Sequence, residues 1–342
     1  MSDAVVPSTR QTMKAVVQRA YGAPEQVLAL ADVDRPPMGD DDVLVRMRAT
    51  SVNTPDWLTV AGRPAVLRLR LGLRRPKAPI RGSDVGGVVE AVGRNVTDLR
   101  PGDEVFGSLW TTSLVVSAGT FAEYAVVPAA QLARKPAGLS FEEAGASVMS
   151  GLTAMLAIRD TARVGPGTRV LINGASGGVG TFAVQIAARL GARVTAVCST
   201  RNIEFVQSLG ADHVIDYTRE DFTRGTQRYD VVLDNVLNHP PARTVTVLAP
   251  GGLFIPNSVG DPRGLLGSLP RVARAMRTRR GSTDARTVVC VVNRENLDAL
   301  GSLLADGDVK VIVERAYPLA EAAGAVAHMA GHRARGQVAI VM

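Results

Sequence analysis

The sequence is poor in the side chains that bind metals and form disulfides. It has only two cysteines, Cys198 and Cys290, and four histidines, all of which lie beyond residue 197. Two thiols cannot build a disulfide framework, and they fit a reducing compartment. Structural zinc sites need cysteine or histidine, and catalytic zinc sites almost always include at least one. We therefore expect no bound metal ion.

Long apolar runs are also missing. No stretch of about 18 uninterrupted apolar residues occurs, and the first residues lack the basic and apolar regions of a secretory signal. We therefore expect a cytoplasmic protein. Aromatic residues make up only 4% of the chain, so aliphatic side chains must dominate the core.

The net charge of +7 comes mainly from scattered arginines rather than from one patch interleaved with aromatics. This pattern favours small anionic ligands, and we expect no nucleic-acid partner. Residues 271–280 are the exception, with five arginines in ten residues.

The length of 342 residues predicts two lobes, because one core usually serves about 150 residues. From Met13 to about Val127, short β-rich runs alternate with turn residues, which predicts a β-barrel lobe. From about Phe141, helices alternate with strands, which predicts a parallel sheet. The predicted strands of that sheet are 169–173, 193–199, 213–217, 229–236, 252–257 and 287–293, the six of a full dinucleotide-binding fold.

The remaining chain predicts a helix, a strand, a second helix and a closing strand that return to the first lobe. We expect a catalytic domain formed by 1–138 and 294–342, with a cofactor domain at 139–293 between them.

A glycine-rich turn joins the first strand of the cofactor domain to a helix. Gly177, Gly178 and Gly180 allow a tight turn and a close backbone approach, and Ala175 stands where many such turns have their first glycine. A helix that begins there presents its free N–H groups to a pyrophosphate. The sequence therefore predicts a dinucleotide site.

The second strand indicates which dinucleotide binds. NAD enzymes place Asp or Glu about 20 residues beyond the turn to bind the ribose 2′-hydroxyl. Here Ser199, Thr200 and Arg201 stand at that place, and Tyr217 follows the third strand. Two hydroxyls and a guanidinium favour a 2′-phosphate, so we predict NADPH.

Eight motifs in order resemble the zinc-independent quinone oxidoreductase branch of the medium-chain dehydrogenase/reductase superfamily, over nearly the whole chain. They are 51–57 (SVNTPDW), 82–89 (GSDVGGVV), 100–107 (RPGDEVFG), 121–124 (FAEY), 150–154 (SGLTA), 175–180 (ASGGVG), 210–217 (GADHVIDY) and 334–336 (ARG). The resemblance implies an α/β protein with a GroES-like β-barrel domain and a Rossmann domain. Asn53 and Ser83 stand where zinc-dependent relatives have Cys and His, and Gln337 stands where relatives often have Lys.

The resemblance also implies roles around the cofactor. The residues expected to cradle the pyrophosphate are Ser176, Gly177, Gly178 and Val179, and those around the 2′-phosphate are Ser199, Thr200, Arg201 and Tyr217. The residues expected beside the nicotinamide are Thr153, Ser258, Val259, Val291 and Val292.

The implied activity is metal-free hydride transfer from NADPH to a quinone or an α,β-unsaturated carbonyl compound. We expect Asn53 to donate a hydrogen bond to the acceptor oxygen, and we place Ser83 at the substrate. Trp57 either stacks on a flat substrate or simply packs. No residue stands out as the proton donor. The alternatives are a non-catalytic NADPH-binding protein and an alcohol dehydrogenase with a recruited metal.

Two segments suggest larger contacts. Residues 264–280 combine an apolar helical face with arginines at three-residue spacing, within a longer inserted segment at 261–286. We favour a lid over the cleft, and a membrane-surface anchor is the less favoured alternative.

The predicted strand 287–293 is apolar at nearly every position, and as a sheet edge it needs cover, so we predict a homodimer through it.

Overall fold

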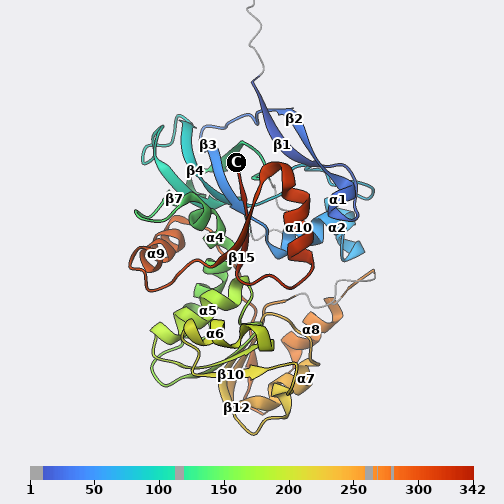
Figure 1. The fold of residues 1–342 in the computed structure, drawn as a ribbon, viewed down its shortest axis with the longest axis vertical. Helices are drawn as coiled ribbons and strands as arrows, with labels where there is room; N and C mark the ends of the chain where they lie inside the picture. The colour runs from blue at the N-terminus through green and yellow to red at the C-terminus, as the bar shows by residue number, and fades with distance from the viewer. Residues whose placement is uncertain (1–10, 112–118, 259–264, 268, 279–280) are drawn as a thin grey trace, which may run out of the picture.

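The computed structural model describes residues 11–111, 119–258, 265–267, 269–278 and 281–342. Figure 1 shows two lobes, an upper one that contains the C-terminus and a lower one that contains β10 and β12. The helices of the described chain are α1 (Pro24–Val27), α2 (Thr54–Ala61), α3 (Arg68–Leu71), α4 (Phe141–Met155), α5 (Gly178–Arg189), α6 (Ile203–Ser208), α7 (Pro241–Thr244), α8 (Leu269–Arg277), α9 (Arg294–Ala305) and α10 (Ala322–Ala330).

The upper lobe is built on a seven-stranded sheet with the order β14-β15-β3-β4-β5-β7, and β6 pairs with β3. Along β3, Val43, Val45 and Met47 are buried and alternate with more exposed residues, as a strand with one face on a core requires. The strands of this lobe are β1 (Thr12–Gln18), β2 (Leu28–Asp34), β3 (Asp42–Ser51), β4 (Asp84–Val92), β5 (Glu104–Ser108), β6 (Tyr124–Pro128), β7 (Leu132–Arg134), β14 (Val313–Pro318) and β15 (Gln337–Val341).

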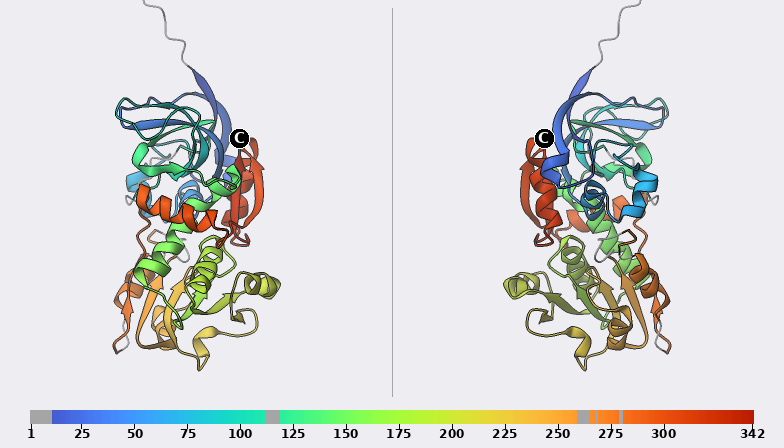
Figure 2. Two further views of the ribbon diagram at one scale, coloured as in Figure 1. Left: turned by 90° about the vertical axis from the view of Figure 1, so that its left-hand side faces the viewer. Right: turned by 90° about the vertical axis from the view of Figure 1, so that its right-hand side faces the viewer.

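The last strands belong to the upper lobe although the lower lobe precedes them in sequence. β15 pairs antiparallel with β3, with Ala339 opposite Ser51, and β14 pairs with β15. Figure 2 shows this C-terminal part (red) standing against the upper lobe. The chain therefore leaves the upper lobe, builds the lower one and returns.

The lower lobe contains a six-stranded parallel sheet with the order β10-β9-β8-β11-β12-β13. In chain order this is 3-2-1-4-5-6, the order of a doubly wound dinucleotide-binding sheet. Its strands are β8 (Arg169–Asn173), β9 (Arg193–Cys198), β10 (His213–Asp216), β11 (Tyr229–Asp234), β12 (Leu248–Pro256) and β13 (Asp284–Ala285).

The sequence was wrong about the sixth strand. β13 covers only Asp284–Ala285, and no strand is formed at 287–293. The register explains the difference, because Leu253 lies opposite Asp284 and β12 ends three residues later at Pro256. Residues 288–293 therefore lie beyond the end of β12, their neighbour in this sheet, and among the described residues they have no strand partner.

A buried carboxyl fixes the entry to α2. The oxygens of Asp56 accept hydrogen bonds from the backbone N–H of Asn53 at 2.8 Å and of Gly82 at 3.2 Å. Asp56 is only 5% exposed, and burial raises its pKa to about 7. This side chain thus joins the start of α2 to the segment that leads into β4.

We expect the free energy of unfolding to fall as the pH rises from about 4 to about 7, because unfolded Asp56 releases a proton that the folded form keeps. The contribution of this carboxyl is up to about 4 kcal/mol. In Asp56→Asn that contribution is absent, so urea unfolding across this pH range should give a flatter dependence. Asp298→Asn, at an exposed position on α9, is the control and should follow the unsubstituted protein. Parallel curves for Asp56→Asn and the unsubstituted protein would contradict the assignment.

Candidate functional site

The glycine-rich turn has the geometry that a phosphate site requires. β8 ends at Asn173, Gly174 adopts a φ of +77°, and α5 begins after Gly177. A Cβ on Gly180 would lie 2.2 Å from the carbonyl oxygen of Gly174, so only glycine fits there. The first N–H groups of α5 have no partner inside the helix, and they are available to an anion.

The C-terminal loop closes over this turn. The N–H of Gly336 donates to the carbonyl of Ser176 at 2.9 Å, and Gly336 pairs with Gly177 as an isolated bridge. The next residue, Gln337, accepts a hydrogen bond from the Ser150 hydroxyl at 3.1 Å. Its buried Nε2 has no partner in the described chain, and it lies 3.0 Å from the place of a Cβ on Gly178.

An unpartnered donor beside a helix N-terminus fits a dinucleotide phosphate, because burying a donor without an acceptor costs about 1–3 kcal/mol. The sequence identified Gln337 only as a departure from the usual Lys. Its position directly after Gly336 was the signal that could have marked it as a site residue.

Four predicted residues lie around the adenosine end. Thr200 Oγ1 donates to Asp216 Oδ2 at 2.5 Å, so its hydrogen is not available to a phosphate in this arrangement. Arg201 donates one N–H to the carbonyl of Arg333 at 2.7 Å and keeps further donors. Ser199 precedes this short turn, and Tyr217 is 57% exposed after β10.

Three further residues at this end escaped the sequence analysis. Hydrogen bonds from Thr200 and then Thr218 hold the pKa of Asp216 below its usual value, and Arg219 lies 3.5 Å from the same carboxylate. Asn202 Nδ2 donates to Ser176 Oγ at 3.0 Å and so links this turn to the phosphate turn. Thr218 and Arg219 follow Asp216 closely in sequence, whereas tertiary contacts bring Thr200 to Asp216 and Asn202 to Ser176. The sequence alone therefore did not mark these residues as one group.

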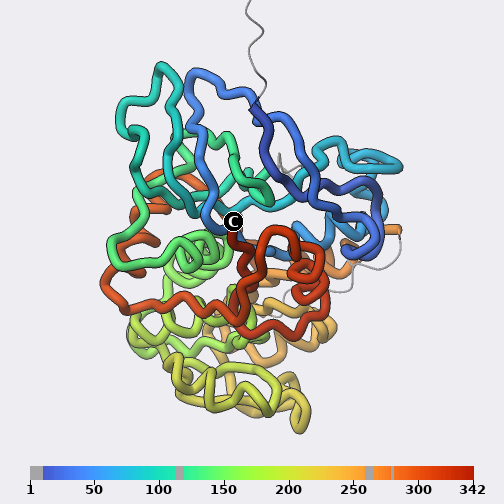
Figure 3. Tube along the Cα trace, turned by 45° about the horizontal axis from the view of Figure 1, so that its top comes forward, coloured from blue at the N-terminus to red at the C-terminus, as the bar shows by residue number. Residues whose placement is uncertain are grey.

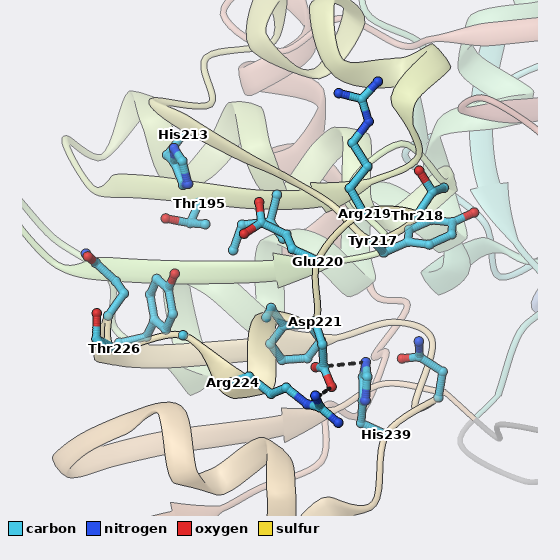
Figure 4. Close-up of a pocket in the computed structure, with 16 residues that line it drawn as sticks. Thr195, His213, Tyr217, Thr218, Arg219, Glu220, Asp221, Arg224, Thr226 and His239 are labelled. Atoms are coloured by element: carbon cyan, nitrogen blue, oxygen red, sulfur yellow. Dashed lines mark ion pairs between the residues drawn. The ribbon is translucent and has the colours of Figure 1, made fainter.

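A cavity of about 970 Å³ opens beside the adenosine end. Figure 4 shows Tyr217 and Thr218 on one side of it and Asp221 with His239 on the other. Asp221 lies 3.7 Å from His239 and 3.5 Å from Arg224. Of the predicted site residues that the structure describes, Tyr217 lines this cavity and the glycine turn does not.

Around α4 the two lobes meet at the predicted nicotinamide end. Thr153 Oγ1 donates to the carbonyl of Met149 at 2.7 Å, and the sulfur of Cys290 lies 4.0 Å from the same oxygen. The N–H of Met149 donates to Asp84 Oδ2 at 3.2 Å. Val292 packs on the lower core, Val291 is 37% exposed, and Ser258 follows β12. Val259 lies outside the described residues.

The predicted donor Asn53 is engaged inside the protein. Its Nδ2 donates to Ser51 Oγ at 2.9 Å and to Asp84 Oδ2 at 3.0 Å. Asn53 is only 3% exposed, so in this arrangement neither amide hydrogen is free for a substrate oxygen. These contacts suit a residue that positions Asp84, and the role of direct donor stays a prediction.

Asp84 and the groups that donate to it, Ser51, Asn53 and the Met149 amide, form what we call the Asp84 cluster. Burial raises its pKa, against hydrogen bonds from Asn53, Ser51, the Met149 amide and Ser108. The first three of these donors meet Oδ2. Oδ1 is buried and has no hydrogen bond within normal geometry in the described chain.

The two predicted substrate residues are buried. Trp57 is 8% exposed and packs edge to face on His332 at 5.1 Å, within a core cluster of the upper lobe. The packing alternative for Trp57 is thus the one that the structure supports. Ser83 is 2% exposed, and its carbonyl accepts from the Leu109 N–H at 2.8 Å. Among the described residues, no three His, Cys, Asp or Glu side chains group closely enough to hold a metal ion.

Comparison with known proteins gives the family. Residues 39–137 match the alcohol dehydrogenase GroES-like domain, and residues 209–340 match a zinc-binding dehydrogenase domain. The chloroplastic quinone-oxidoreductase QR1 of Triphysaria versicolor is 30% identical over 96% of this chain and 98% of its own length. The trans-enoyl reductase pgmF of Aspergillus terreus is 40% identical, over 58% of this chain and 56% of its own length.

Solved structures agree with this result. The quinone oxidoreductase from Coxiella burnetii superposes with a TM-score of 0.85 at 28% identity, covering 97% of this chain and 100% of the other. The Escherichia coli quinone oxidoreductase complexed with NADPH superposes with a TM-score of 0.80 at 26% identity, with the same coverage. The predicted fold class, a GroES-like domain with a Rossmann domain, is confirmed. The chain belongs to the medium-chain dehydrogenase/reductase superfamily, together with its quinone oxidoreductases.

Proposed function

We propose that this protein is an NADPH-dependent reductase of quinones or α,β-unsaturated carbonyl compounds. One observation carries the proposal: the phosphate turn, closed by Gly336, lies at one end of a site whose other end is the Asp84 cluster. α4 joins the two ends, because it carries Ser150, which contacts Gln337, and Met149, which contacts Asp84. The relatives named quinone oxidoreductase and trans-enoyl reductase support both classes of acceptor.

The cofactor roles follow from this placement. Residues 176–180 and Gln337 would hold the pyrophosphate, and Arg201 and Tyr217 with Ser199 and Thr200 would surround the 2′-phosphate. We add Arg219, because its guanidinium neutralises the nearby Asp216 carboxylate. The expected nicotinamide residues remain Thr153, Ser258, Val259, Val291 and Val292.

NADPH supplies the hydride, which goes to the electron-poor carbon of the acceptor while negative charge moves to the acceptor oxygen. A neutral Asp84 adds no opposing charge near that oxygen, whereas an ionised Asp84 would repel it. Ser51 and Asn53 both donate to Oδ2, so the proton that Asp84 would supply belongs on Oδ1. We propose Asp84 as the acid that the sequence did not reveal.

We also propose a homodimer through residues 288–293. Val289 and Val291 are 56% and 37% exposed, whereas Val288, Cys290 and Val292 pack on the lower core. This alternation presents one apolar row and leaves the segment without a strand partner in the described chain. The same segment of a second copy would supply that partner.

A cytoplasmic location remains a proposal, supported by the two free cysteines. Among the described helices, none is long and apolar enough to cross a bilayer. The division into 1–138 with 294–342 and 139–293 also remains a proposal, supported by the pairing of β15 with β3.

The direct test is the initial rate of NADPH oxidation with a naphthoquinone, an ortho-quinone, a long-chain 2-alkenal and an aliphatic ketone. We expect turnover of the quinones or the alkenal, retained after chelation, and a lower rate with NADH. Tight NADPH binding without turnover of any acceptor would support the non-catalytic alternative. Ketone reduction that is lost on chelation would support the metal-dependent alternative.

A second prediction concerns the 2′-phosphate. In Arg201→Gln, we expect the KM for NADPH to rise at least about tenfold, because a hydrogen bond to a charged group contributes about 1.5–3 kcal/mol. The KM for NADH should stay unchanged, since NADH has no phosphate there. Arg193→Gln, at an exposed position on β9, is the control and should change neither value. An equal rise for both cofactors would argue against a phosphate contact at Arg201.

A third prediction concerns assembly. Light scattering coupled to gel filtration should give about twice the chain mass of 36.0 kDa for the unsubstituted protein. Val289→Asp/Val291→Asp should give the single-chain mass, because two charges on the pairing edge oppose association. Leu30→Asp, at an exposed leucine of β2, should remain a dimer. A monomeric unsubstituted protein, or a dimeric double variant, would refute this interface.

A further inference from the structure

Exposed leucines gather on two segments that are distant in sequence. Among the described residues, six leucines are exposed, and five of them lie at 69, 73, 265, 266 and 269. Leu69, Leu73 and Leu265 are each about 70% exposed. We call these five leucines, with the exposed cations Arg70, Arg74, Arg75, Lys77, Arg274 and Arg277, the leucine–arginine surface.

The two segments touch each other. The N–H of Val66 donates to the carbonyl of Leu265 at 3.0 Å, a bond between the upper lobe and the chain that leads into α8. Figures 1 and 3 show this chain (orange) extending from the lower lobe toward the upper one. The two leucine-bearing segments therefore lie next to each other, and together they form the leucine–arginine surface.

The charge of this face has one sign. Between Asp56 and Asp84 the sequence has seven basic residues and no acidic one, and between Asp261 and Asp284 it has six basic residues and no acidic one. A second copy of the same surface would meet it with repulsion. A complementary partner therefore carries negative charge at its surface and has apolar groups below that surface.

The apolar face of α8 is not part of this surface. Ala275 is fully buried and Val272 packs beside it on the lower core, while Arg271 donates to the carbonyl of Leu237 at 3.1 Å. The free leucines instead precede α8 or stand at its first residue. The sequence-based picture of one amphipathic helix as the anchor is thus replaced by leucines from two segments.

We propose that the leucine–arginine surface binds the surface of an anionic lipid bilayer. The leucines enter the boundary between headgroups and acyl chains, and the guanidinium groups pair with lipid phosphates. Both contributions are needed, because a few apolar side chains alone give only marginal binding. Juxtaposed basic residues add an attraction that salt screens.

The two segments adjoin predicted site residues in sequence. Residues 62–77 follow α2, which begins directly after Asn53, and residues 265–277 belong to the segment that follows Ser258. A docked molecule would bring these parts of the chain to the lipid, where quinones with long side chains dissolve. This consequence rests on the proposed function, whereas the binding itself does not.

The test is flotation of the full chain with vesicles of phosphatidylcholine alone or mixed with phosphatidylglycerol, at physiological ionic strength. We expect binding to the mixed vesicles and not to phosphatidylcholine alone. Arg70→Gln/Arg74→Gln should lower partitioning about 25-fold, at about fivefold per arginine. Leu69→Ser/Leu73→Ser should lower it on the order of tenfold.

Matched controls separate this surface from general effects. Arg163→Gln/Arg193→Gln removes two exposed arginines elsewhere, and Leu30→Ser/Met38→Ser removes two exposed apolar side chains elsewhere; both should bind as the unsubstituted protein does. Absence of binding to the mixed vesicles, or equal losses in controls and test variants, would overturn the proposal. Binding to a DNA duplex that the same arginine variants abolish, without vesicle binding, would also overturn it.

Activity measurements distinguish failure of the membrane-binding proposal from failure of the proposed reductase function. With a water-soluble quinone, the surface variants should turn over at the unsubstituted rate, because none of these residues contacts the cofactor turn or the Asp84 cluster. A changed KM for that quinone in Leu69→Ser/Leu73→Ser, without a change in vesicle binding, would identify the segment as a cover of the cleft and refute membrane docking.

Discussion

The hydrogen bond from Gly336 to the Ser176 carbonyl ties the phosphate turn to the end of the chain. Gln337 follows and begins β15, which pairs with β3 so that Ala339 lies opposite Ser51. Ser51 in turn donates to Asp84. One continuous route of backbone and hydrogen bonds thus runs from the cofactor phosphates to the buried acid. The spacing between the two ends of the site is fixed by strand register rather than by loops.

Two buried carboxyls flank the segment between α2 and β4, and their hydrogen bonds differ. Asp56 distributes its two oxygens between the Asn53 and Gly82 amides, so both oxygens are satisfied by the backbone. Asp84 collects donors on one oxygen and leaves the other without a partner. The hydrogen bonds of Asp56 fix the start of α2 against the segment that leads into β4. The second arrangement, with the raised pKa of Asp84, supports the proposal that this residue acts as an acid.

The sequence predicted correctly the elements whose structure depends on residues that are close together in the chain. The predicted strand 169–173 has the bounds of β8, and the turn that follows it leads into α5 as expected, because strand, glycines and helix are neighbours in sequence. The strand at 287–293 failed because its partner is not in the described chain. Asn53 was read as a free donor because spacing does not reveal that Ser51 and Asp84 take its hydrogens. Gln337 and Asp216 emerged only when distant segments were brought together.

For the inserted segment at 261–286, the expectation from composition and the structure differ in which element carries the exposed apolar groups. Arginines at three-residue spacing and apolar residues between them suggested one amphipathic helix, yet packing turns Val272 and Ala275 of α8 toward the lower core. The exposed apolar groups come from the residues before α8 and at its start, and from α3 and the residues that follow it on the other lobe. The Val66–Leu265 bond joins these two segments across the lobes, so the exposed leucines form a surface to which both lobes contribute.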